Sequence, residues 1–248
     1  MKTIIALAGF IILFFLYHAA EYMIMFKNSP VGFLAFQFLF LIAAWGIAKW
    51  QGRPGLKAWG LDTQRGFLIH LVVGLLMGCL LYGITFLIGC LAGIERLVEI
   101  PTFATIAMPL GLFVFGNFFS SLSEDILTRG YVFAHLRGKV GTSFLAFISA
   151  TIYLLNHIYR LGDGFQAYLY LFLLGVLFII PLLRTNRLWF TVGMHWAGNV
   201  TFYLVHELWR TEDTGHVLSA NYVLAAVILL FIPLNNFVLK LLRVRGQV

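Results

Sequence analysis

Long uninterrupted apolar runs constrain this chain more than any other feature of its sequence. A helix that spans a lipid bilayer needs about 20 consecutive apolar residues, and such runs follow one another along all 248 residues. The sequence therefore predicts an all-α, polytopic membrane helix bundle with about eight transmembrane helices. The expected spans are residues 3–26, 31–50, 66–94, 102–122, 142–160, 165–183, 188–209 and 218–242.

The composition excludes several classes of protein. With 61% hydrophobic and 11% charged residues, the chain cannot cover a soluble surface with polar groups, which excludes an ordinary cytosolic enzyme and a disordered protein. So few charges also make a nucleic-acid partner unexpected, although the net charge is +7. Because no long hydrophilic stretch interrupts the apolar runs, we expect a single integral-membrane domain over residues 1–248, with membrane lipid as its surroundings.

The basic residues of the connecting segments predict an orientation. Lys and Arg favour the cytoplasmic side of a membrane, and most of them fall on one side of the eight-helix arrangement. We therefore expect a multi-pass protein of the cytoplasmic membrane with both termini cytoplasmic and with an uncleaved first helix. The basic residues on the expected cytoplasmic side are Lys2, Lys49, Arg53, Lys57, Arg65, Arg137, Lys139, Arg184, Arg187, Lys240, Arg243 and Arg245.

The third span contains two pairs of small residues, Gly74-xxx-Gly78 and Gly89-xxx-Gly93. Glycines four positions apart let two membrane helices approach closely. We expect these pairs to pack helices within one molecule rather than to form a dimer.

Ionisable residues inside apolar helices are costly and therefore point to function. The fourth span continues into Glu124, Asp125 and Arg129, of which Asp125 and Arg129 are four apart and can pair on one face. Glu124 points about 100° away from that face and is free to line a cavity. The alternative interpretation is that residues 120–137 form a cytoplasmic extension with ordinary surface charges.

Two later helices carry polar pairs at the same spacing. Tyr153-xxx-His157 lies in the fifth expected span and His195-xxx-Asn199 in the seventh. A carboxylate and two histidines suit hydrolysis in two ways. Glu124, His157 and His195 would bind a divalent metal such as Zn²⁺ that activates water, or Glu124 would act as the general base with no metal. In the second scheme His157 orients the water, while His195 and Asn199 stabilise the developing oxyanion.

A further polar pair lies outside this pattern. His18 and Glu21 are three residues apart in the first span and share a helix face. We expect a local hydrogen-bonded pair there rather than a catalytic one.

The motifs over about residues 120–200 resemble those of the CPBP family, the CAAX proteases and bacteriocin-processing enzymes also called Abi. That family shows EExxxR, FxxxH and HxxxN or HxxxB on successive membrane helices, and this chain has Glu124-Asp125-xxx-Arg129, Tyr153-xxx-His157 and His195-xxx-Asn199. The resemblance implies an intramembrane endopeptidase in which Arg129 positions the acidic pair. Asp125 and Tyr153 depart from the family's Glu and Phe: Asp125 is one methylene shorter but keeps the charge that can pair with Arg129.

The sequence therefore favours an intramembrane endopeptidase that hydrolyses a peptide bond of a protein or peptide substrate with a membrane-proximal cleavage site. The expected catalytic residues are Glu124, His157, His195 and Asn199, supported by Asp125 and Arg129. The cofactor is open between none and zinc. A proton-coupled membrane transporter, which also uses buried Glu and His, and a non-catalytic membrane immunity or scaffold protein are the alternatives.

Overall fold

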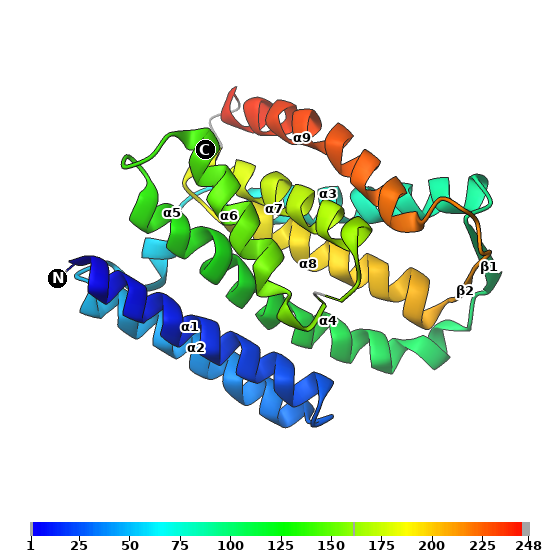
Figure 1. The fold of residues 1–248 in the computed structure, drawn as a ribbon, viewed down its shortest axis with the longest axis horizontal. Coiled ribbons are helices and arrows are strands. Elements are labelled where there is room, and N and C mark those ends of the chain that lie inside the picture. Colours follow the sequence, from blue (N-terminus) through cyan, green and yellow to red (C-terminus); the bar gives the residue numbers. More distant parts are fainter. Residues whose placement is uncertain (1, 161, 245–248) are drawn as a thin grey trace.

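The computed structural model describes residues 2–160 and 162–244, and every predicted span contains a helix. The structure confirms the all-α, polytopic bundle (Figure 1). Arg245, one of the basic residues counted above, lies outside the described residues. The helices are α1 (Lys2–Met25), α2 (Pro30–Trp50), α3 (Phe67–Leu91), α4 (Phe103–Asp125), α6 (Thr142–Asn156), α7 (Phe165–Thr185), α8 (Trp189–Tyr203) and α9 (Ala220–Val244).

The helices differ in their capacity to cross a bilayer. Six stretches are long and apolar enough to do so, namely α1, α2, α3, α7, α9 and the segment Phe103–Leu136. Helices α6 and α8 have 15 residues each, fewer than the roughly 20 that a full crossing needs. The expected set of about eight spans thus consists of six long helical stretches and two short helices, and this chain is an integral membrane protein.

The fourth predicted span extends further than expected. Helix α4 continues past residue 122 to Asp125, passes through one π-helical turn, η2 (Ile126–Gly130), and ends in the short helix α5 (Tyr131–Leu136). Helix formation continues beyond the apolar run because the charged side chains there are buried among partners instead of facing solvent. Single π-helical turns inside α-helices are frequent at functional sites.

The fifth predicted span is shorter than expected. Helix α6 ends at Asn156 rather than at residue 160, and a 3₁₀ turn, η3 (Ile158–Arg160), follows. His157 has left the helical conformation, with φ −86° and ψ 51°. Its placement inside the fifth helix was therefore wrong: the imidazole lies just beyond the helix end.

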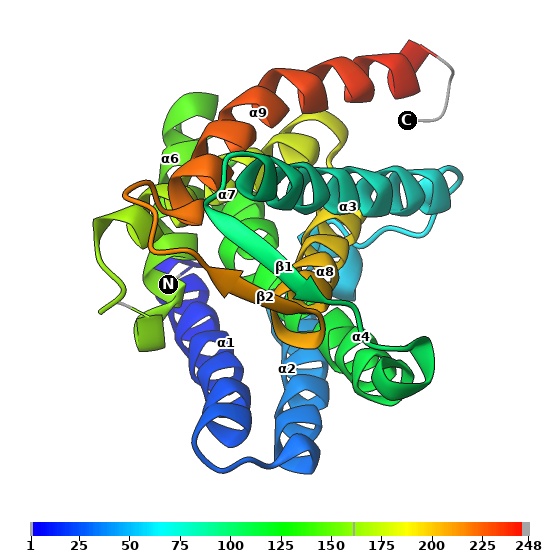
Figure 2. The same ribbon diagram turned by 90° about the vertical axis from the view of Figure 1, so that its right-hand side faces the viewer.

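The apolar pattern did not predict a short antiparallel ribbon. Strand β1 (Glu95–Glu99) pairs with β2 (Arg210–Asp213), which follows the π-helical turn η4 (Leu204–Leu208). Arg96 pairs with Glu212 in register and donates a hydrogen bond of 2.8 Å to its carboxylate. The ribbon joins the α3–α4 and α8–α9 connections at one end of the molecule (Figure 2).

Close approach of α3 and α8 depends on glycine. A Cβ atom on Gly74 would lie 2.1 Å from the carbonyl oxygen of Phe190, and one on Gly78 would lie 2.2 Å from that of Met194. Packing of this pair within one molecule is therefore confirmed. Gly93 instead follows the end of α3 with φ +71°, a left-handed conformation that glycine adopts at helix ends.

The arrangement places the end of α4 at a seam between two apolar clusters. Tyr153 and Phe178 belong to a cluster built from α3, α6, α7, α8 and α9. Ile126 and Leu127 belong to a second cluster with α1 and α2, which pack side by side as a hairpin (Figures 1 and 2). Side chains from both clusters therefore surround the buried polar residues described next.

A buried carboxylate–histidine site at the ends of α4 and α6

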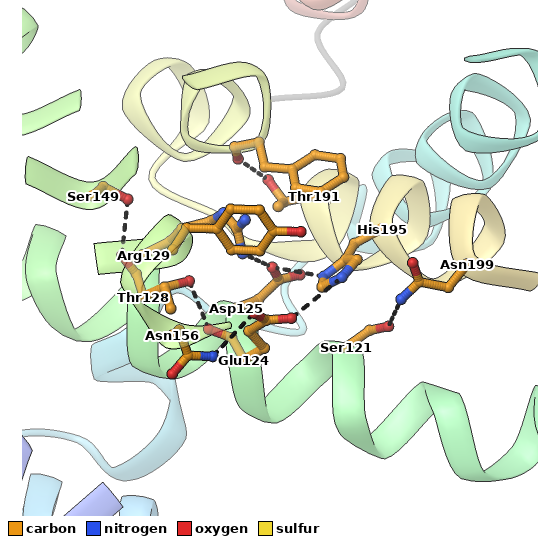
Figure 3. A network of polar contacts seen from close by, with 12 residues as sticks. Ser121, Glu124, Asp125, Thr128, Arg129, Ser149, Asn156, Thr191, His195 and Asn199 are labelled. Carbon is orange, nitrogen blue, oxygen red and sulfur yellow. Dashed lines mark hydrogen bonds and ion pairs between the residues drawn. The ribbon is translucent and has the colours of Figure 1, made fainter. Parts of the chain in front are cut away.

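Glu124 lies where three helices converge. One carboxylate oxygen, Oε2, is 3.5 Å from Nε2 of His195 on α8. The other, Oε1, is 3.9 Å from Nδ1 of His157 and accepts a hydrogen bond of 3.0 Å from the side-chain amide of Asn156. The structure thus brings one histidine from each of the other two motifs, His157 and His195, to the Glu124 carboxylate; Figure 3 shows His195 beside it.

His195 lies between two carboxylates. Its Nδ1 is 3.2 Å from Oδ1 of Asp125, while its Nε2 faces Glu124. Asp125 is fully buried and His195 is 3% exposed. A ring held at both nitrogens by acceptors has a fixed orientation, so Asp125 sets the plane of His195 even though it is one methylene shorter than glutamate.

Arg129 supplies the positive charge that this acidic pair requires. Its Nη1 donates to Asp125 Oδ1, and both side chains are fully buried. The guanidinium carbon lies 4.4 Å from the ring centre of Tyr153 and 4.9 Å from that of Phe178. Aromatic faces stabilise a desolvated cation. The three charged side chains of Glu124, Asp125 and Arg129 are all buried. Their burial excludes the alternative that residues 120–137 are a solvated extension.

A backbone carbonyl orients the His157 ring. Its Nδ1 lies 2.8 Å from the carbonyl oxygen of Tyr153. Because a carbonyl only accepts, Nδ1 donates this hydrogen bond, and Nε2 takes no part in it. The side chain is 17% exposed, compared with 6% for Glu124 and 3% for His195. His157 is therefore the most accessible imidazole of the site.

Asn199 lies one helical turn from His195 but contacts a different residue of α4. Its Nδ2 is 3.5 Å from the hydroxyl of Ser121, which donates to Asn117 Oδ1 at 3.0 Å. The pairs Asp125–His195 and Ser121–Asn199 form two successive rungs between α4 and α8 (Figure 3). Asn199 thus extends the polar face toward one side of Glu124 without touching it in the described structure.

Several supporting groups were not singled out from the sequence. The hydroxyl of Thr128 donates to the carbonyl oxygen of Glu124 at 2.8 Å, and Ser149 donates to the carbonyl of Thr128 at 2.8 Å. Asn156, which contacts the Glu124 carboxylate itself, was also missed. The available signal was an amide residue directly before His157 at the end of an apolar run.

The metal alternative was tested against the donor geometry. Among the described residues, no group of three or more His, Cys, Asp and Glu side chains could hold a metal ion. Nδ1 of His157 is taken by a backbone carbonyl, and both nitrogens of His195 face carboxylates. In this donor geometry the arrangement of Glu124, His157 and His195 does not fit a metal site.

A cavity of about 480 Å³ approaches the site from the side of α1 and α2. Apolar side chains form most of its wall, including those of Phe33, Leu112 and Phe113. Polar groups occur where Glu21, Asn117 and Ser120 line it. Since Ser120 precedes Glu124 by four residues, this polar part lies about one helical turn from the carboxylate.

Comparison with known proteins identifies one related family. Residues 106–201 match the family model described as "Type II CAAX prenyl endopeptidase Rce1-like". The matched segment contains all three motifs and confirms the resemblance inferred from them. No curated protein and no solved structure matches the chain.

Proposed function

We propose that this membrane protein, whose residues 106–201 match the Rce1-like model of type II CAAX prenyl endopeptidases, hydrolyses a peptide bond by means of water activated at Glu124. Its substrate is a protein or peptide cleaved near the membrane surface. The family match favours this activity over a transporter or a non-catalytic scaffold.

One observation supports the proposal more than any other. A single buried carboxylate lies within 3.9 Å of two imidazoles, one on α8 and one just beyond the end of α6. Such a grouping is expensive in an apolar bundle, and a hydrolytic site gives it a use. A carboxylate and imidazoles of this kind are the groups that transfer protons to and from water in general acid–base catalysis.

The proposed chemistry assigns a role to each side chain. Glu124 accepts a proton from water, whose oxygen bonds to the carbonyl carbon of the scissile peptide, and His157 orients that water. His195 and Asn199 stabilise the negative charge that develops on the carbonyl oxygen. Glu124 then returns the proton to the departing amine as the C–N bond breaks. Arg129 and Asp125 hold His195 and Glu124 in place.

The cavity supports a substrate that arrives within the membrane. It lies between the α1–α2 hairpin and α4, and its walls are mostly apolar. A substrate with an apolar chain, such as a prenylated peptide, would fit that lining, while its peptide group reaches the polar part near Ser120. We further propose that both termini are cytoplasmic and that the protein resides in the cytoplasmic membrane.

The test uses purified full-length protein in proteoliposomes and quenched fluorescent CAAX-type peptides of one sequence, with and without a farnesyl group. Glu124→Gln keeps the shape of the side chain but removes the base, so we expect peptide cleavage to fall by about 10²–10⁴-fold. His195→Ala is expected to fall comparably. Glu207→Gln, at an exposed position outside the site, serves as the matched control.

Cleavage at the normal rate by Glu124→Gln would refute the role of this carboxylate. Equal cleavage of the two peptides would reject a prenyl requirement and leave the hydrolytic site standing. Metal analysis of the purified protein, together with chelator treatment, tests the alternative that Glu124, His157 and His195 bind zinc. Loss of activity on chelation that returns with Zn²⁺ would overturn the metal-free scheme.

A further inference from the structure

Asn156 holds the Glu124 carboxylate from the side opposite His195. It is the last residue of α6 and is 2% exposed. Its side-chain nitrogen donates to Glu124 Oε1 at 3.0 Å, while His195 faces Oε2 (Figure 3). The two oxygens of the carboxylate are thus fixed by different helices, and the direction of Glu124 depends on both.

The end of α6 is in turn held by α1. Nε2 of His18 lies 2.9 Å from the carbonyl oxygen of Asn156, and Nδ1 lies 2.8 Å from that of Phe14. The last carbonyls of a helix have no partner within the helix, so His18 satisfies one of them from a distant part of the chain. His18 is itself buried, at 5% exposed.

Glu21 completes this arrangement. Both contacts of His18 are made to carbonyl oxygens, which accept hydrogen bonds. Glu21 Oε2 lies 3.8 Å from Nε2 of the same ring. His18 and Glu21 thus lie side by side as predicted, but the hydrogen bond predicted between them was wrong, because the hydrogen bonds of His18 go to the backbone.

We propose that Asn156 is a positioning residue for Glu124 and that His18, supported by Glu21, positions Asn156. This inference rests on the function proposed above. It makes α1 part of the catalytic apparatus, although α1 lies outside residues 106–201, which match the family model. Fraying at the end of α6 would displace Asn156 and the adjoining His157 together, which is why one contact to this carbonyl matters.

The first test compares Asn156→Ala with Asn236→Ala, which lies on α9 and bonds to the α9 backbone and to Arg184. Cleavage of the farnesylated peptide is measured as kcat and KM, with the melting temperature of each variant. We expect Asn156→Ala to lower kcat by about 10–100-fold, as loss of a supporting group does, with KM within about twofold of wild type. Asn236→Ala is expected to match wild type.

A second pair of variants keeps the inference testable if Asn156→Ala folds poorly. His18→Gln retains an N–H that can reach the Asn156 carbonyl, whereas His18→Leu has none. We expect His18→Gln to retain at least about tenfold more kcat than His18→Leu at similar melting temperatures. A purely structural role for His18 would instead make the losses of activity follow the losses of folded protein.

The outcomes separate this inference from the proposed function. Full kcat in Asn156→Ala, with no cleavage by Glu124→Gln, would refute the positioning role and leave the base in place. Equal kcat in His18→Gln and His18→Leu would show that α1 does not position Asn156. Cleavage at the normal rate by Glu124→Gln would instead refute the proposed function itself, in which Glu124 is the base.

Discussion

Arg129 carries a positive charge into a position with no exposed surface. Burying a charge is costly unless it is paired, and removing one partner of a buried pair leaves the other uncompensated. Asp125 pairs with the guanidinium, and the rings of Tyr153 and Phe178 lie against it, which offsets part of this cost. Arg129 and Asp125 therefore stabilise the fold as well as belonging to the proposed catalytic site.

Arg129→Met is expected to lower the free energy of unfolding by about 3–5 kcal/mol, because Asp125 loses its counter-charge. Arg129→Lys keeps the charge but loses the planar group between the rings, so we expect a smaller loss. Unfolding of the purified protein in detergent measures both. Arg137→Met, at an exposed position, is the control; equal stability of Arg129→Met and this control would contradict the expectation.

Asp125→Asn tests whether the Asp125 carboxylate orients the ring of His195. The amide keeps the size of the side chain but removes the charge that faces Nδ1 of His195 and Nη1 of Arg129. We expect kcat for peptide cleavage to fall by about 10–100-fold with a smaller change in KM. An unchanged kcat would show that the orientation of His195 does not depend on Asp125.

For single residues, the sequence predicted contacts between side chains of the same helix. The spacing of Asp125 and Arg129 predicted their pairing, which the structure contains. It could not reveal that Asn156 contacts Glu124, because this bond joins two helices and depends on where α6 ends. The end of α6 was in turn hidden by the apolar residues on either side of Asn156 and His157.

Among the elements, α8 depends on α3 for its position. The backbones approach so closely that a Cβ atom at Gly78 would collide with the carbonyl oxygen of Met194, the residue before His195. Any larger residue must push the two helices apart. The position of His195 therefore depends on a contact that involves none of the proposed catalytic groups.

Gly78→Ala is expected to reduce the free energy of unfolding by about 1–3 kcal/mol, as overpacking does, and to slow peptide cleavage by displacing His195. Gly83 lies on the same helix with nothing within 4 Å of an added Cβ atom. Gly83→Ala is therefore the matched control, and we expect it to be neutral or to stabilise the helix by about 0.5–1 kcal/mol. Equal melting temperatures for the two variants would argue against the close packing.

The sequence predicted where the helices lie better than where they end. Apolar runs locate all eight helical segments, since burial in lipid requires them. The β1–β2 ribbon was missed because its strands are only five and four residues long and pair across a large separation in sequence. The π-helical turn after Asp125 was also missed, since no residue type marks it.

On the scale of the whole molecule, successive helices alternate in direction. The loop between α5 and α6 lies at one end of the bundle, and the ribbon with the loop before α9 lies at the other (Figure 1). The basic residues Arg137 and Lys139 belong to the first end. The proposed orientation therefore places that end in the cytoplasm.

Single cysteines can test this orientation. In a background with Cys79 and Cys90 replaced by alanine, Lys139→Cys and Val217→Cys place exposed thiols at opposite ends. A membrane-impermeant maleimide added to intact cells is expected to label Val217→Cys and to label Lys139→Cys only after lysis. Labelling of both thiols from outside would contradict the two-sided arrangement, and the reversed pattern would invert it.

The glycine contact between α3 and α8 has a practical consequence for anyone who seeks a minimal enzyme. Residues 106–201 contain every motif, yet Gly74 and Gly78, against which α8 packs, precede that segment. A truncated or grafted fragment would keep the recognisable motifs and lose the surface that aligns one of them. The smallest functional fragment is therefore expected to be longer than the segment that contains the motifs.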